Sequence, residues 1–149
     1  MPTISVGDKV PEFTIPTTGG DFRLGARRKD NLVVYFYPRD NTPGCTLEGS
    51  DFRDLAPAFR RAGTVILGIS TDSVEENRKF AEKEGFAFPL LCDTDRKVSM
   101  AYGAAADASA AYAKRRTVVI GPDGKVEQIL EKVDVKTHAD TVLESLPAK

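Results

Sequence analysis

A short segment, Pro38–Cys45, joins two patterns of different period and constrains the fold more than any other part of the chain. Before it, the apolar run Leu32–Tyr37 predicts a strand that is covered on both faces, because no polar residues alternate with the apolar ones. After it, residues 46–63 carry apolar side chains at helical spacing. Pro43 and Gly44 suit the first positions of a helix, so the chain is expected to turn from a buried strand directly into a helix.

Cys45 falls in the first turn of this predicted helix. Unpaired backbone N–H groups and the positive end of the helix dipole favour an anion there. Such surroundings lower the pKa of a thiol, and the thiolate is the nucleophilic form. Many cysteines are inert apolar fillers, but the position of this one favours a reactive thiolate. Later in the same helix, Pro57 predicts a kink or a short break near Ala56.

The residues Pro38, Thr42 and Cys45 form a Pro-x-x-x-Thr-x-x-Cys pattern. This pattern resembles the signature of the peroxiredoxins, and Thr42–Glu48 is similar to the peroxiredoxin Q, or bacterioferritin comigratory protein, subfamily. The resemblance covers nearly the full chain and implies one domain, residues 1–149. Further matching segments follow in family order at 68–72, 88–91, 101–103, 115–120 and 122–125.

Strands and helices alternate through the middle of the chain, and a hairpin and a last helix follow. This order predicts an α/β fold with a central mixed sheet that helices flank on both faces. An amino-terminal β-hairpin is expected within residues 10–24, and a capping box at Ser73 and Glu76 is expected to begin a helix. A second hairpin is expected over residues 117–130, with the last helix after Thr137. Among such folds, the resemblance implies the thioredoxin-like one.

The resemblance further implies a thiol-dependent peroxidase that acts on hydrogen peroxide and organic hydroperoxides. Cys45 would attack a peroxide oxygen and become a sulfenic acid. The hydroxyl of Thr42 and the backbone N–H groups of Gly44 and Cys45 would hold the peroxide, and Pro38 would shield the sulfur from water. This chemistry needs no cofactor.

A cation is expected beside the thiolate, and family spacing assigns this role to Arg115. Arg116 is the alternative, and if the segment is a strand it points to the other face. Either arginine could instead be an exposed charge at a strand end. Glu48 resembles a family glutamate that orients hydrogen bonds in the site, although a helix-favouring acid in the first turn explains it nearly as well.

The chain departs from the family at the positions of a second, resolving cysteine. Many peroxiredoxin Q proteins have it five residues after the first, where this chain has Ser50. Others have it in the next helix, where this chain has Ala81. Cys92 is the remaining thiol. A disulfide requires Cα atoms within about 7 Å, and nothing in the sequence brings Cys92 that close to Cys45 without rearrangement. A one-cysteine mechanism is therefore expected, in which an external thiol reduces Cys45, with a resolving role for Cys92 as the alternative.

Composition limits the partners and the compartment that can be expected. A formal net charge of −1 gives no reason to expect nucleic acid or an acidic membrane. No signal peptide or membrane span is recognised, and two cysteines do not form a secreted disulfide framework, so a cytoplasmic protein is expected. A monomer is also expected. The single histidine, His138, is expected at the surface, and most imidazole metal sites are excluded. The implied reductant is thioredoxin, glutaredoxin or a low-molecular-weight thiol.

The sequence is compatible with two other functions. The first is a thiol–disulfide oxidoreductase, which would have to use Cys45 with an external thiol because the chain has no C-x-x-C pair. The second is a thioredoxin-fold binding or holdase module whose cysteine is incidental.

Overall fold

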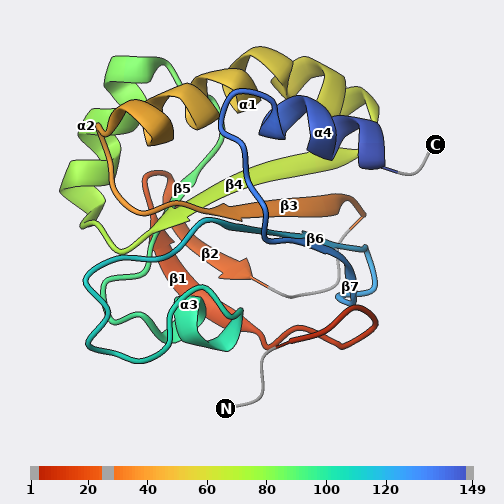
Figure 1. Ribbon diagram of the computed structural model, residues 1–149, viewed down its shortest axis with the longest axis horizontal. Coiled ribbons are helices and arrows are strands. Elements are labelled where there is room, and N and C mark those ends of the chain that lie inside the picture. The colour runs from red at the N-terminus through yellow and green to blue at the C-terminus, as the bar shows by residue number, and fades with distance from the viewer. Residues whose placement is uncertain (1–3, 25–28, 147–149) are drawn as a thin grey trace.

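A seven-stranded mixed sheet forms the centre of the molecule (Figure 1). The structure is a computed structural model that describes residues 4–24 and 29–146. The strand order is β2-β1-β5-β4-β3-β6-β7. The strands are β1 (Phe13–Thr17), β2 (Gly20–Leu24), β3 (Asn31–Phe36), β4 (Thr64–Ser70), β5 (Leu90–Cys92), β6 (Arg116–Ile120) and β7 (Val126–Leu130).

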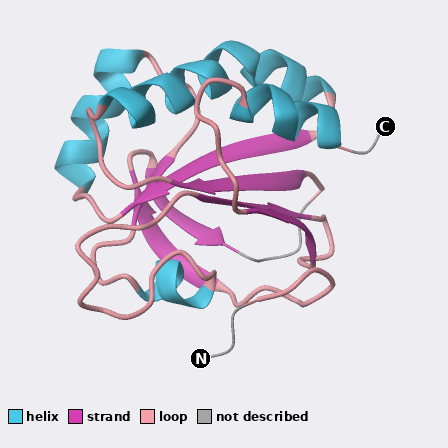
Figure 2. Cartoon of the chain, in the orientation of Figure 1, coloured by secondary structure: helices cyan, strands magenta, loops and turns pink. Residues whose placement is uncertain are grey.

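Helices cover both faces of this sheet, as expected. Helices α1 (Pro43–Arg61), α2 (Val74–Glu84) and α4 (His138–Ser145) lie along one face, and the short helix α3 (Lys97–Ala101) lies on the other (Figure 2). Each face has its own apolar cluster, and the cluster under α1 contains Phe52, Phe59 and Cys45. Fully burying one such aromatic side chain contributes about 1.5–3 kcal/mol.

Most of the expected elements are confirmed. Both hairpins form, every residue of β3 is buried, and Ser73 and Glu76 make the capping box of α2. The short strand β5 begins two residues later and ends one residue later than the apolar run at 88–91 suggested. Helix α1 is continuous through Pro57, which contradicts the short break that was expected as the alternative to a kink. Pro57 is exposed, and a helix tolerates proline where water can take over the lost backbone hydrogen bond.

The pairing of the strands explains how distant segments meet. Strands β3, β4 and β5 are parallel, so their carboxyl ends lie at one edge of the sheet. Strand β6 is antiparallel to β3, with Arg116 opposite Phe36, and therefore begins at that same edge. The segment that follows β3 and the residue that precedes β6 are thus brought together.

Candidate active site

The start of α1 places Cys45 where the sequence predicted. Thr42 is the N-cap, and its Oγ1 accepts a hydrogen bond from the backbone N–H of Cys45 at 3.4 Å. The Thr42 hydroxyl donates to the carbonyl oxygen of Arg39 at 3.2 Å. Thr42 therefore holds the loop against the first turn of the helix, and its hydroxyl is engaged with backbone groups.

Arg115 reaches across the sheet edge to this turn. Its Nη2 lies 3.3 Å from Sγ of Cys45, and its Nη1 donates to Oε1 of Glu48 at 2.8 Å. A Cβ atom on Gly44 would lie only 2.8 Å from Nη2 of Arg115. The glycine thus leaves room for the guanidinium, and a planar fork of donors serves the sulfur and the carboxylate together.

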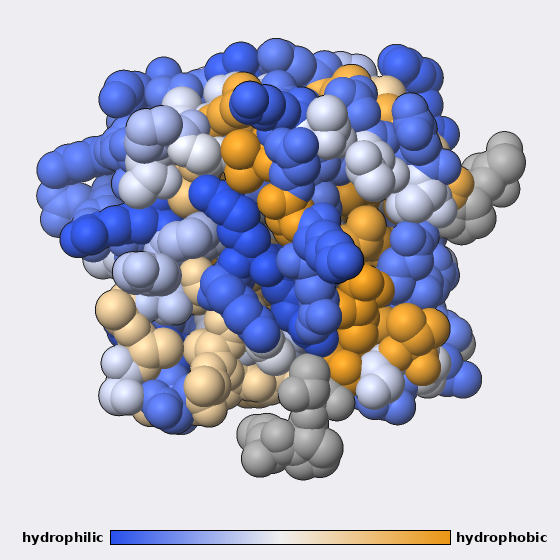
Figure 3. All heavy atoms as spheres, viewed as in Figure 1, coloured by the Kyte–Doolittle hydropathy of each residue, from blue (hydrophilic) through white to orange (hydrophobic). Residues whose placement is uncertain are grey.

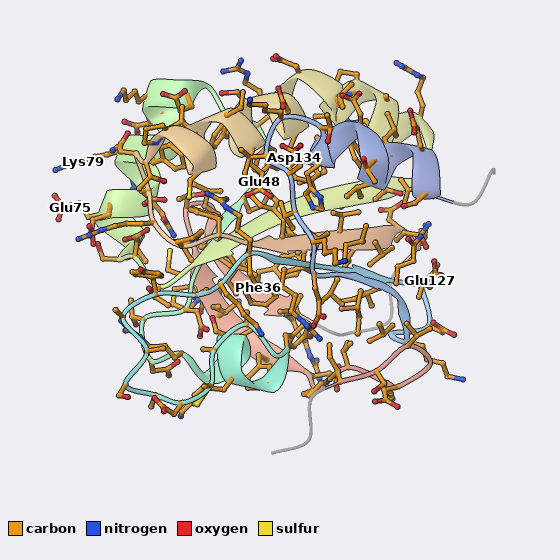
Figure 4. All side chains as sticks on the ribbon, in the orientation of Figure 1. Phe36, Glu48, Glu75, Lys79, Glu127 and Asp134 are labelled. Carbon is orange, nitrogen blue, oxygen red and sulfur yellow. The ribbon has the colours of Figure 1, made fainter. Side chains whose placement is uncertain are left out.

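Glu48 is buried and lies beyond the first turn of α1, so the alternative of a helix-favouring acid in the first turn is wrong. Its side chain is 1% exposed, and Figure 4 shows it on the side of α1 that faces the sheet. Burial raises the pKa of Glu48 to about 7, and the neighbouring Arg115 opposes this rise. Oε2 of Glu48 has no hydrogen-bond partner among the described residues. The carboxyl group can therefore change its protonation state near neutral pH.

Arg115 and Arg116 point to opposite sides, as alternation along an extended chain requires. Arg115 contacts Glu48 and the sulfur, whereas Arg116 is buried and pairs with Glu131.

Cys45 itself is 1% exposed, while the Arg115 side chain keeps 24% of its surface exposed. Figure 3 shows the face seen in Figure 1, where hydrophilic residues cover the upper left over α2 and hydrophobic ones form a band right of the centre.

No described contact places Pro38 against the sulfur of Cys45. It lines a hollow of about 270 Å³ together with Arg39, Asp72 and Arg96, and Cys45 is not among the residues that line this hollow. Shielding of the sulfur by Pro38 stays a prediction.

Cys92 ends β5 in separate surroundings. Both cysteines are free, and Cys92 is 2% exposed. Nδ2 of Asn77 lies 3.2 Å from its Sγ, and Oδ1 of Asn77 accepts a hydrogen bond from Ser70 Oγ at 3.1 Å. Burial raises the pKa of the Cys92 thiol, so the protonated form is favoured.

The expectation that His138 lies at the surface is wrong. The residue is 2% exposed, and its Nε2 is 2.7 Å from Oγ1 of Thr117. Helical spacing could have indicated this, because His138 lies four positions before the buried Val142 and shares its face. Burial, with a smaller contribution from Arg115, lowers the pKa of His138 to about 4.

In the described part of the chain, no three His, Cys, Asp or Glu side chains are grouped so as to hold a metal ion. Within residues 4–24 and 29–146, none of the helices combines the length and apolar character that crossing a bilayer requires.

Proteins of known sequence are similar to this chain over most of its length. Residues 6–129 match the AhpC/TSA family. Peroxiredoxin Bcp of Xanthomonas campestris is 46% identical over 145 residues, which cover 91% of this chain and 90% of that protein. Peroxiredoxin Bcp of Escherichia coli K12 is 36% identical over 149 residues, which cover 96% of each.

Solved structures of similarly named proteins resemble this chain in fold. Peroxidoxin BcpB from Mycobacterium tuberculosis has a TM-score of 0.86 at 38% identity, over 95% of each chain. The bacterioferritin comigratory protein of X. campestris, studied for alkyl peroxide reduction, has a TM-score of 0.83 at 41% identity, over 90% of this chain and 89% of that one. Two cysteine-to-serine variants of X. campestris peroxiredoxin Q, at positions 48 and 84 of that protein, are equally similar. The expected thioredoxin-like fold is confirmed, and the chain belongs to the AhpC/TSA family as a peroxiredoxin of the Bcp, or Q, group.

Proposed function

We propose that this thiol-dependent peroxidase reduces hydrogen peroxide and organic hydroperoxides through the thiolate of Cys45. The 3.3 Å contact between Nη2 of Arg115 and Sγ of Cys45, at the start of α1, carries the proposal. A guanidinium stays charged at every working pH and favours an anionic sulfur beside it. The alkyl peroxide reduction studied in the Xanthomonas relative supports organic hydroperoxides as substrates.

In the first step, the sulfur of Cys45 attacks one peroxide oxygen. An S–O bond forms, the O–O bond breaks, and the departing oxygen leaves as hydroxide or alkoxide and takes up a proton. The protein sulfur is oxidised to a sulfenic acid, and the peroxide is reduced to water or an alcohol. Charge moves from the sulfur to the departing oxygen, so donors fixed beside both atoms lower the barrier.

Arg115 is the main donor in this proposal, because one guanidinium can contact the sulfur and an arriving peroxide together. Glu48 holds the guanidinium in place through its 2.8 Å ion pair. Thr42 and the N–H of Gly44 would contact the peroxide after a small shift, since the Thr42 hydroxyl is engaged with Arg39 and with the N–H of Cys45. The peroxide would enter on the Arg115 side, where side-chain surface remains exposed.

The sulfenic acid is reduced by a one-cysteine mechanism in this proposal. Burial raises the pKa of the Cys92 thiol, which makes Cys92 a poor nucleophile. In X. campestris peroxiredoxin Q the cysteines replaced by serine stand at its positions 48 and 84. The same separation counted from Cys45 reaches Ala81, which cannot act as a resolving thiol.

An external thiol therefore completes the cycle. It attacks the sulfenic sulfur of Cys45, releases water and leaves a mixed disulfide, and a second thiol then frees the cysteine. Thioredoxin, glutaredoxin and low-molecular-weight thiols are the reductants proposed. We further propose that the protein acts in the cytoplasm as a monomer, with residues 1–149 as one domain.

Stopped-flow mixing with hydrogen peroxide and with an organic hydroperoxide tests this function. Wild-type protein should lose one free thiol much faster than free cysteine does, Cys45→Ser should abolish the reaction, and Cys92→Ser should leave it unchanged. Mass analysis under non-reducing conditions should show the sulfenic acid or a mixed disulfide at Cys45. A bond between Cys45 and Cys92 would overturn the one-cysteine mechanism, and a rate no higher than that of free cysteine would overturn the peroxidase function.

A further inference from the structure

His138 of α4 contacts both β6 and α1, the helix that carries Cys45. It is the first residue of α4, and its Nε2 lies 2.7 Å from Oγ1 of Thr117 in β6. Its ring meets Phe52 of α1 edge-on, with ring centroids 5.9 Å apart and the planes at 82°. One buried side chain thus fixes the end of α4 against both a strand and the helix that carries the reactive cysteine.

The contact with Thr117 acts on the segment that carries Arg115. Arg115 precedes Thr117 by two positions, so on an extended chain the two side chains share a face. Thr117 also pairs with Tyr35 across the β3–β6 ladder, and directly opposed side chains of such a ladder lie on one face. The hydrogen bond to His138 therefore anchors β6 close to the point where the guanidinium leaves the sheet edge.

The contact with Phe52 acts on the segment that carries Glu48. The two residues are four positions apart on α1 and lie on the same side of the helix. Phe52 stacks on Tyr35, with ring centroids 4.5 Å apart and the planes at 16°. His138 contacts the same Phe52 ring edge-on, so the position of the α1 segment that carries Glu48 depends on it.

The electrostatics are compatible with this arrangement. Burial, aided by Arg115, lowers the pKa of His138 to about 4, so the ring is neutral at neutral pH. A neutral imidazole can bond to Thr117 without adding a second positive charge beside the guanidinium.

We infer that His138 is a positioning residue for the peroxidase reaction and acts through Thr117 and Phe52. These two residues fix the segments that carry Arg115 and Glu48, and so fix the distance between the guanidinium and the sulfur. The inference rests on the proposed function of Cys45. His138 itself touches neither the sulfur nor, in this proposal, the peroxide.

Two substitutions at this position separate positioning from packing. His138→Phe keeps a ring against Phe52 but removes the hydrogen bond to Thr117. His138→Gln can place an amide nitrogen where Nε2 lies and restore that bond. Stopped-flow oxidation by hydrogen peroxide, the thiolate absorbance at 240 nm at pH 7 and thermal unfolding are measured for each. Because misplacement by about 1 Å can cost up to ~10²-fold in rate, we expect a loss of ~10-fold for the Phe variant and recovery to within ~3-fold for the Gln variant.

A second pair of substitutions, at Thr117, gives a test that does not depend on how well the His138 variants fold. Thr117→Val should lower the rate and the thiolate absorbance as His138→Phe does, and Thr117→Ser should retain both. Since both substitutions break the same hydrogen bond, the double variant should be no slower than the slower single one. Thr141→Val, on the exposed side of α4, is the matched control and should react like wild type.

The outcomes are distinct. If His138→Phe and Thr117→Val lower the unfolding temperature but retain the wild-type rate and thiolate absorbance, the role is only structural and the inference is wrong. If wild-type protein reacts no faster than free cysteine, the proposed function fails instead. The thiolate absorbance reports the effect on Cys45 without any peroxide being present.

Discussion

The guanidinium of Arg115 packs against the backbone of Gly44, where a Cβ atom would lie 2.8 Å from Nη2. This contact predicts the result of Gly44→Ala. The added methyl group would displace the guanidinium from Cys45, so oxidation by peroxide should slow by ~10-fold. Alanine favours a helix, so the free energy of unfolding should change little. Stopped-flow kinetics and urea unfolding measure the two quantities.

Gly19→Ala is the matched control, because the nearest described atom that a Cβ there would meet is Oγ1 of Thr17, at 3.9 Å. It should leave the peroxide reaction as fast as in wild type. Equal rates for the variants at Gly44 and Gly19 would contradict the close packing of the guanidinium described here.

Arg115→Lys tests the fork of donors rather than the charge. Lysine keeps the positive charge, but the charge and its donors are concentrated on one nitrogen. It therefore cannot contact both Cys45 and Glu48 in the present geometry. We expect the second-order rate constant for peroxide to fall by ~10²-fold, as for loss of one preorganised donor. The thiolate absorbance at 240 nm should fall as well. A lysine variant that retains the wild-type rate would show that charge alone is sufficient.

Thr42 should contribute to both stability and activity as the N-cap of α1. Thr42→Val removes the oxygen that accepts from the N–H of Cys45, which should cost about 1 kcal/mol in the free energy of unfolding. Thr42→Ser keeps that oxygen and should recover most of the loss. Urea unfolding measures the difference, and the same two variants compared with peroxide show whether the hydroxyl also serves the reaction. Equal stabilities for Val and Ser would contradict the capping role.

Local signals explain why much of the fold could be predicted. The apolar run of β3, the proline at the start of α1 and the capping box at Ser73 and Glu76 each depend on neighbours within a few residues. The start of α1 therefore placed Cys45 correctly from sequence. The break at Pro57 was wrong because proline chemistry alone does not say whether that side of the helix faces water.

The rest of the site depends on contacts between distant segments. Arg115 and Glu48 are 67 positions apart and meet because β6 pairs antiparallel with β3, a register that no local pattern specifies. The resemblance to a family, not the spacing, indicated Arg115. Burial of Glu48 and His138 could have been inferred more locally, since each lies four positions before a buried apolar residue on its helix. Both were missed because polar residues are usually exposed.

Glu48 and His138 make opposite contributions to the pH dependence of stability. The pKa of Glu48 is raised from 4.5 to about 7, so its contribution is fully present below pH 4.5 and is lost as the pH rises through about 7. The pKa of His138 is lowered from 6.5 to about 4, so its contribution is present above pH 6.5 and is lost as the pH falls through about 4. The pH dependence of wild-type stability alone therefore does not separate the contribution of Glu48 from that of His138.

Comparison with Glu48→Gln isolates the carboxyl group. Glutamine cannot ionise, so the free energy of unfolding of wild type relative to this variant should fall between pH 4.5 and 8 by about 3 kcal/mol at most. Urea unfolding at pH 4.5, 6 and 8 measures the difference. Glu75→Gln is the control, because Glu75 is exposed on α2 next to Lys79 (Figure 4) and should give a difference that varies little with pH. If the difference for Glu48 were equally flat, ionisation of this buried acid would not oppose folding, and its desolvation would be fully offset by Arg115.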